Sequence, residues 1–332
     1  MSPRGQLQSE TDEHSSCCRC SDERLAMGGA VTVSVDFELR WGMHDRLGLD
    51  ADLYRDNLEQ VPAIVPELLR LFTQYGVHAT WATVGAILCN GWDDYFARAP
   101  APPRYRNSRL AVDVRYSEMD PDGHLHFAPS LVQAISGCRG QDLGTHTFSH
   151  LFLGEPGVTP QDASADIASA MRIHLERTGE APVSLVFPRN QWAFLDVMRS
   201  HGIRLWRGTE RSWYFRRTDS HSRSAVIRAL QLLDGLNPWT AHTAPVEGDM
   251  TRSSLFLRVG LPDAAWKATL RKIRRALLLL RDGEVFHLWF HPHNFGTERA
   301  KRLARLEQAL EIIATSAALR GLSLRSMREL AG

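Results

Sequence analysis

The sequence lacks a long apolar run and a charge excess of either sign. Its best candidate for an apolar run, residues 277–280, lies between Arg275 and Arg281, whereas a membrane-spanning helix needs about 18 or more apolar residues in succession. Lys and Arg number 39 against 38 Asp and Glu, so the chain has no basic excess with which to neutralise many phosphates. These two features exclude a transmembrane segment and a general nucleic-acid partner.

Cysteine is also scarce. The 332 residues include five cysteines, too few for a disulfide framework. Three of them, Cys17, Cys18 and Cys20, lie close together in a polar segment, and no second Cys/His pair follows at zinc-finger spacing. Residues 1–28 have no apolar region of the kind found in secretory signals. We therefore expect a disordered N-terminal tail and a cytoplasmic location, and the role of the cysteine cluster stays open.

From Ala30 onward, strand-like and helix-like segments alternate over short links. The run AVTVSVDF is rich in β-branched residues and is typical of a strand buried on both faces. Alternation of this kind predicts a parallel sheet with helical crossovers, in one barrel-like α/β domain over residues 29–332. Further strands are expected within 77–85, 142–148, 184–190 and 284–296, and helices within 58–75, 129–137, 161–179, 194–202, 264–280 and 297–317.

Polar side chains gather where four of these strands end. In parallel α/β folds the chemistry collects at the carboxyl ends of the strands, so these groups are expected to converge on one reaction centre. They are Asp36 and Glu38, His146 and His150, Arg189 and Asn190, and His291 and His293.

Two of these pairs have the spacing of a metal site. His146 and His150 lie four residues apart, which puts both imidazoles on one face of a helical turn, where they can clamp one ion. Asp36 and Glu38 lie two apart and point the same way in an extended chain. They suggest one metal ligand and one general base, in either order. Two histidines and a carboxylate also fit a non-haem iron oxygenase, although the alternating helices and strands argue against the folds in which such sites are common.

The remaining strand ends offer groups for proton transfer. Arg189 could pair with the base carboxylate and keep it ionised and oriented. Either His291 or His293 could act as the general acid, because the pKa of an imidazole lies near the working pH. His287 lies within the apolar run of the same strand and is expected in the core.

The order and character of these motifs resemble the polysaccharide deacetylases with a NodB-homology domain, carbohydrate esterase family 4. The segments SVDFE, HTFSH, FPRNQ and LWFHPH stand where that family has its aspartate, histidine, arginine and final histidine motifs. The resemblance runs from Val31 to Phe295. Three details depart from the family pattern. Phe37 separates the two acids, Pro188 precedes the arginine instead of following it, and the family's acidic motif with a tryptophan has only a loose counterpart around Trp206 to Trp213.

The resemblance implies a distorted (β/α) barrel and a divalent metal, with zinc the first choice. Glu38, His146 and His150 would hold the ion, which leaves coordination positions open for water and substrate. Asp36 would act as the base, Arg189 would keep it ionised, and His291 would protonate the leaving amine.

The expected reaction is hydrolysis of an N-acyl group, acetyl or formyl, from an amino sugar. A nucleotide- or lipid-linked precursor of a surface glycan is the favoured substrate. Two alternatives stay open: a hydrolase of a non-sugar amide, similar to allantoinases or imidases, and a carbohydrate-binding relative without activity. The sequence does not predict the oligomeric state.

Overall fold

A mainly parallel sheet organises the chain in a computed structural model that describes residues 28–46, 54–112, 115–215, 225–240 and 242–332. The strand order is β6-β9-β1-β2-β3-β4-β5-β7, with β10 beside β1 and β8 beside β9. Every pairing of these strands is parallel except that of β6 with β9. The strands are β1 (Ala30–Phe37), β2 (Ala79–Thr83), β3 (Gln141–Thr145), β4 (Ser184–Val186), β5 (Leu205–Gly208), β6 (Ala244–Pro245), β7 (Met250–Arg252), β8 (Leu255–Phe256), β9 (Glu284–Phe290) and β10 (Ser323–Leu324).

Strand β1 lies in the middle of this sheet, as its sequence predicts. All eight of its residues are buried, and β9 and β2 pair with its two edges. A strand covered on both faces selects a run rich in apolar and β-branched residues, which explains AVTVSVDF. The acid at Asp36 breaks that pattern and lies at the site described below.

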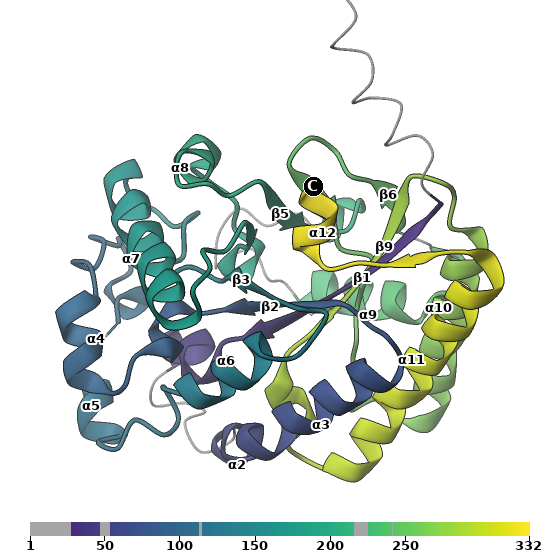
Figure 1. The fold of residues 1–332 in the computed structure, drawn as a ribbon, viewed down its shortest axis with the longest axis horizontal. Helices are drawn as coiled ribbons and strands as arrows, with labels where there is room; N and C mark the ends of the chain where they lie inside the picture. The colour runs from purple at the N-terminus through teal and green to yellow at the C-terminus, as the bar shows by residue number, and fades with distance from the viewer. Residues whose placement is uncertain (1–27, 47–53, 113–114, 216–224, 241) are drawn as a thin grey trace, which may run out of the picture.

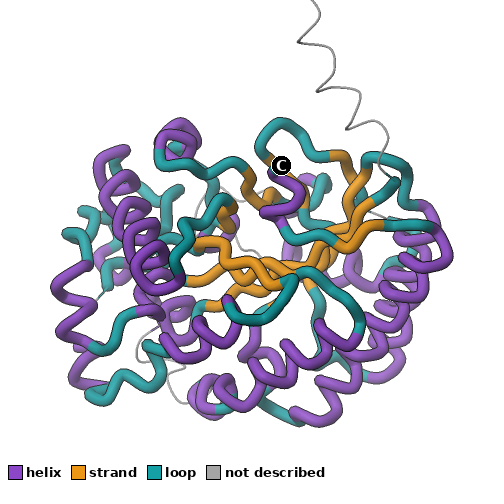
Figure 2. The backbone as a smooth tube through the Cα atoms, viewed as in Figure 1, coloured by secondary structure: helices purple, strands orange, loops and turns teal. Residues whose placement is uncertain are grey.

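Helices surround the outer side of the sheet (Figures 1 and 2). The helix expected over 58–75 is divided in two, because Pro62 lacks an N–H and so starts a new helix after Gln60. Among the described residues, every helix is too short or too polar to span a bilayer. The α-helices are α2 (Arg55–Glu59), α3 (Val61–Gln74), α4 (Trp92–Arg98), α5 (Arg115–Met119), α6 (Pro129–Ser136), α7 (Pro160–Thr178), α8 (Leu195–Ser200), α9 (Ala225–Leu236), α10 (Asp263–Leu279), α11 (Arg299–Arg320) and α12 (Met327–Ala331).

The segment 250–256 nearly closes the sheet into a barrel. Its first half, β7, pairs with β5, and its second half, β8, pairs with β9. Between them, Ser253 N donates to Gly208 O at 3.0 Å and Ser254 N donates to His287 O at 2.8 Å. The distorted (β/α) barrel in a single domain is therefore confirmed. The predicted tail and its three cysteines lie outside the described residues.

Parallel pairing brings several strand ends to the same edge of the barrel. Phe37 is in register with Thr83, Thr83 with Thr145, and Thr145 with Leu185. The residues that follow β1, β3, β4 and β9 therefore emerge side by side. These are the four strand ends that the sequence marks with polar residues.

Candidate metal centre and active site

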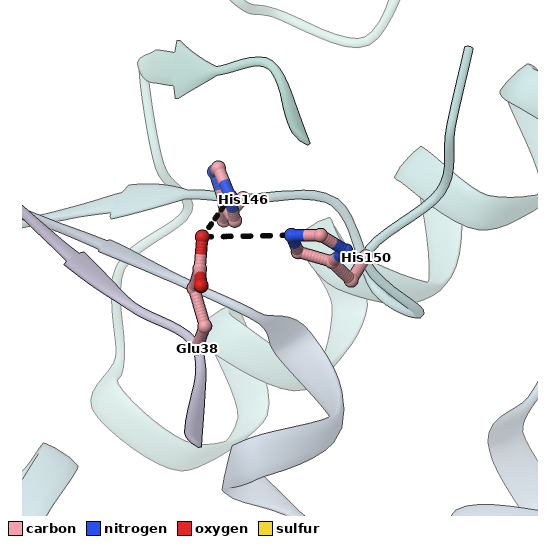
Figure 3. A group of neighbouring side chains, drawn as sticks. All are labelled: Glu38, His146 and His150. Atoms are coloured by element: carbon pink, nitrogen blue, oxygen red, sulfur yellow. Dashed lines mark hydrogen bonds and ion pairs between the residues drawn. The ribbon is translucent and has the colours of Figure 1, made fainter. Parts of the chain in front are cut away.

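Glu38, His146 and His150 come together at this edge (Figure 3). Glu38 Oε1 lies 3.1 Å from His146 Nε2 and 3.5 Å from His150 Nε2. All three residues are buried, and one ligand atom from each lies within 4.8 Å of the others. The structure thus contains a group that could hold a metal ion, made of the residues expected from the sequence.

A tight turn, and not a helix, brings the two histidines together. Thr147 and His150 adopt φ of 63° and 56°, in the left-handed region that residues other than glycine seldom occupy. Leu151 N donates to Thr147 Oγ1 at 2.8 Å. From α7, the Asp166 carboxylate accepts hydrogen bonds from the backbone N–H groups of Phe148 and Ser149 at 2.7 and 3.1 Å. These bonds hold the strained turn. The four-residue spacing of His146 and His150 alone predicts a helical turn there.

The hydrogen bonds of the two imidazoles fit a cation between them. His146 Nδ1 lies 2.7 Å from Val186 O, and since a carbonyl can only accept, Nδ1 carries the proton. In the neutral ring, Nε2 then directs its lone pair toward Glu38 Oε1. Neither ring nitrogen of His150 has a hydrogen-bond partner among the described residues, although both are buried. Two imidazole nitrogens with free lone pairs next to a carboxylate oxygen form a set of ligands that suits a divalent ion.

The charges in this group perturb one another strongly. Burial alone would raise the pKa of Glu38, but the imidazoles of His291, His146 and His150 hold it well below its usual value. Burial lowers the pKa of His150 to about 4, so its ring is neutral at neutral pH. Burial also opposes the charged form of His291, but the nearby carboxylates of Glu38 and Asp36 outweigh it and raise the pKa of that imidazole.

Asp36 is held by Arg207, which is a correction to the pairing with Arg189 expected from the sequence. Arg207 Nη1 donates to Asp36 Oδ1 and Nη2 to Oδ2, each at 2.7 Å. Nη1 also donates to Ser34 Oγ at 2.8 Å, and the guanidinium lies 4.2 Å from the centre of the Trp289 ring. This bidentate, fully buried contact fixes the orientation of the carboxylate.

The backbone after β4 directs Arg189 elsewhere. Arg189 and Asn190 both have φ of 54°, and the Arg189 guanidinium lies 4.2 Å from the centre of the Phe152 ring. Asn190 Oδ1 lies 3.5 Å from Arg207 Nη2, so this strand end reaches the Asp36–Arg207 pair through Asn190. Arg189 still lines the same pocket as Asp36.

The histidines after β9 occupy different positions. His291 Nε2 lies 3.4 Å from Glu38 Oε1 and 3.8 Å from Asp36 Oδ2. His293 stacks behind it with ring centres 4.9 Å apart, and burial lowers its pKa to about 3. Within β9, His287 is fully buried with Nε2 2.9 Å from Ser34 Oγ, a core position as expected. Of the two candidates for the general acid, His291 is therefore the one that faces the carboxylates.

Two residues of the site escape the sequence analysis. Arg207 is a charge inside the apolar strand β5, between Trp206 and Gly208, and a buried charge of this kind signals a fixed partner. Asp166 lies on α7 and is buried. Neither residue follows a strand end, so neither belongs to the pattern that marks the other site residues in the sequence.

The site opens into a pocket of about 570 Å³. Asp36, Glu38 and His291 line it, together with the aromatic rings of Trp289 and Phe256, whose centres lie 4.4 Å apart. The polar side chains of Glu210, Arg228, Gln231 and Arg258 also line it.

The chain is similar to known proteins in sequence and in fold. Residues 52–206 match the family model described as polysaccharide deacetylase. A structure from Mycobacterium smegmatis, named as a candidate polysaccharide deacetylase, aligns with a TM-score of 0.56 and 16% identity over 91% of this chain and 88% of that one. A family 4 carbohydrate esterase from Streptomyces lividans aligns with a TM-score of 0.41 and 14% identity over 90% and 92% of the two chains. A CE4 esterase from Streptococcus mutans gives 0.43 and 15% over 92% and 88%. No curated protein matches the sequence.

The matched segment includes His146 and His150, whereas Asp36 and Glu38 precede it and His291 follows it. The Mycobacterium structure, at its low identity, supports the fold. The family model, which matches just under half of the chain, and this barrel together support a polysaccharide deacetylase with a NodB-homology domain.

Proposed function

We propose that the protein is a metal-dependent hydrolase that removes an acetyl or formyl group from the nitrogen of an amino sugar. The observation that carries this proposal is the cluster of Glu38, His146 and His150 with Asp36 and His291 beside it, at the base of one pocket. In this arrangement a base and an acid both lie next to three metal ligands, which is what hydrolysis of an amide requires.

Glu38, His146 and His150 would hold the ion, and zinc is the metal we favour for two imidazoles and one carboxylate. When bound, the ion would supply a Lewis acid for the acyl carbonyl and for water. Asp36 is the less suitable ligand, because Arg207 engages both of its oxygens. This difference favours Glu38 over Asp36 as the ligand and leaves Asp36 as the base.

Proton transfer would be divided between two residues. Asp36, oriented by Arg207, takes a proton from the attacking water through a remaining lone pair on its carboxylate. His291 gives its proton to the departing nitrogen as the C–N bond breaks, and the carboxylates of Glu38 and Asp36, which raise the pKa of this imidazole, favour its protonated form. The products are a free amine on the sugar and acetate or formate.

The pocket suits a sugar that carries polar substituents. Trp289 and Phe256 offer rings on which an apolar sugar face can pack, and Glu210 and Arg258 offer an acceptor and donors for its hydroxyls. A nucleotide- or lipid-linked glycan precursor is the substrate we favour. The cytoplasmic location expected from the sequence stays a prediction.

A substrate panel tests the proposal. Zinc-loaded protein is incubated with N-acetyl and N-formyl amino sugars, free and linked to nucleotide or lipid phosphate, and with non-sugar amides such as cyclic ureides. Release of acetate or formate is measured beside His146→Ala. We expect release from at least one amino sugar and none from the variant. Release only from the non-sugar amides would show that the substrate is not an amino sugar. Equal release by His146→Ala would contradict the proposed ligand set.

A further inference from the structure

Helix α9 is apolar, yet the core does not use its apolar side chains. Its buried residues are Asp234 and Gly235. Helices in proteins ordinarily owe most of their stability to burial of an apolar face. The aliphatic residues of α9, all exposed or partly exposed, are Val226, Ile227, Leu230, Leu232, Leu233 and Leu236.

A buried polar network attaches α9 to the barrel instead. The Asp234 carboxylate lies 2.9 Å from Lys272 Nζ and 2.9 Å from His242 Nε2, and it accepts a hydrogen bond from Tyr214 Oη at 2.6 Å. Lys272 Nζ also donates to the Asp234 backbone oxygen at 2.6 Å. Because these contacts hold the helix in place, its aliphatic face stays available for another partner.

The two sides of α9 face different surroundings. Arg228, Gln231 and Leu232 line the pocket of the active site, and at 100° per residue they share one side of the helix. Val226 and Leu233 lie on the opposite side, where they are 67% and 62% exposed. The helix therefore forms a wall with the active site on one side and an exposed aliphatic face on the other.

Two exposed tryptophans and one partly exposed arginine lie near this face. Trp213 is 65% exposed on the short helix η5 (Trp213–Phe215), whose Tyr214 bonds to α9, and Trp239 is 74% exposed just after α9. The Arg275 guanidinium lies 4.0 Å from the centre of the Trp239 ring. In residues 225–240 the one acid is Asp234, which is buried and paired with Lys272. We call Trp213, Val226, Leu230, Leu233, Trp239 and Arg275 the α9 surface.

We propose that the α9 surface docks on an anionic lipid bilayer. An aliphatic helix face with exposed tryptophans and a guanidinium beside it is what the interface of such a bilayer binds. Self-association fits less well, because a two-fold contact would bring Arg275 of the two copies to one interface, and the six residues of the α9 surface include no acid to pair with it. Docking places α9, which forms one wall of the active-site pocket, at the membrane. If the proposed deacetylation also holds, an amino sugar carried on a lipid would reach the pocket past this helix.

Vesicle flotation of the full chain tests the docking without any assay of activity. The vesicles are phosphatidylcholine alone, or phosphatidylcholine and phosphatidylglycerol in equal amounts. The test variant is Val226→Ser/Leu233→Ser, in which both side chains are exposed and lie outside the pocket lining. The matched control is Leu175→Ser/Leu319→Ser, which changes two side chains that are 55% and 81% exposed on α7 and α11. Thermal melting shows that both variants are folded.

We expect binding to the anionic vesicles that weakens with added salt. In the test variant, binding should be weaker by about tenfold or more, since two aliphatic contacts are lost, and the control should bind as the wild type does. No flotation with either vesicle, or equal flotation by the test variant, would overturn the proposal. A dimer that Val226→Ser/Leu233→Ser dissociates, in a chain that does not float, would assign the surface to a second copy. Because flotation is independent of turnover, failure of the proposed function would leave this result unchanged.

Discussion

At the scale of single residues, the two arginines near Asp36 differ in what their geometry allows. Arg207 makes two parallel hydrogen bonds to the carboxylate and is fully buried. Arg189 lines the pocket of the active site and packs on Phe152. A bidentate guanidinium fixes the plane of its carboxylate, which an ammonium or an amide in the same place would not do. The orientation of the base therefore depends on Arg207.

Arg207→Gln should lower kcat/KM by about a hundredfold or more, because a small misplacement of a catalytic group is that costly. Loss of a buried partner should also reduce the free energy of unfolding by about 3–5 kcal/mol. Arg207→Lys keeps the charge but loses the second hydrogen bond, and it should recover little activity. Steady-state kinetics and urea unfolding measure both effects. The matched control Arg199→Gln, at an exposed ion pair, should change neither. An Arg189→Gln variant that loses more activity than Arg207→Gln would contradict this assignment.

The general acid makes a second prediction at this scale. His291→Asn should lower kcat on an N-acyl amino sugar by a factor of about 100 to 10,000, the usual contribution of a positioned acid. On an ester with a phenol leaving group, which departs without a proton, the same variant should lose much less.

His293→Asn is the matched control, because His293 stacks on His291 without facing the carboxylates. It should lower the two rates to a similar extent. An equal loss on both substrates by His291→Asn would mean that this imidazole is not the acid.

At the scale of single elements, the turn after β3 depends on α7. Asp166 accepts two backbone N–H groups of that turn and the Ser149 hydroxyl. Burial raises the pKa of Asp166 from 3.8 to about 6, against these hydrogen bonds, which lower it. The native state thus binds this proton more tightly than the unfolded chain does.

The sign of the pH dependence follows from that difference. Below pH 3.8 the Asp166 carboxyl is protonated in both states, and between 3.8 and about 6 only the native state keeps the proton. The free energy of unfolding should fall across this range by about 3 kcal/mol relative to Asp166→Asn, which does not titrate. Urea unfolding of both proteins at several pH values measures the difference. Ser149→Ala, which keeps the carboxylate, should retain the pH dependence. A difference in the free energy of unfolding between wild type and Asp166→Asn that does not change with pH would exclude this role of Asp166.

The same scale shows which elements the sequence predicts well. Strand β1 is evident because a strand that is buried along its whole length has a run of apolar residues. Helix α7 is evident because Thr159 and Asp162, which form a capping box, mark its start, and Gly179, at φ 80°, marks its end. These signals are local. The segment from Arg211 to Ser254 shows no clear periodicity, because α9 is fixed by the contact of Asp234 with Lys272, which is distant in sequence.

At the scale of the whole molecule, the barrel joins residues that are far apart in the chain. All six site residues expected from the sequence follow or end strands, and the parallel register brings four of them, Asp36, His146, His150 and His291, around Glu38. Arg207 could not be predicted in this way, because its role depends on the approach of β5 to Asp36 across the barrel interior. Strand ends are visible in a sequence, whereas contacts across a barrel are not.

The most direct test of this site is the metal content of purified, zinc-reconstituted protein, measured together with acetate or formate release. Wild type is compared with Glu38→Ala and His150→Ala, and with His78→Gln, which changes an exposed histidine paired with Glu329. We expect about one ion per chain in the wild type and in His78→Gln, and loss of both the ion and the activity in the other two variants. A wild type that binds no ion after reconstitution, or ligand variants that keep it, would contradict the metal centre.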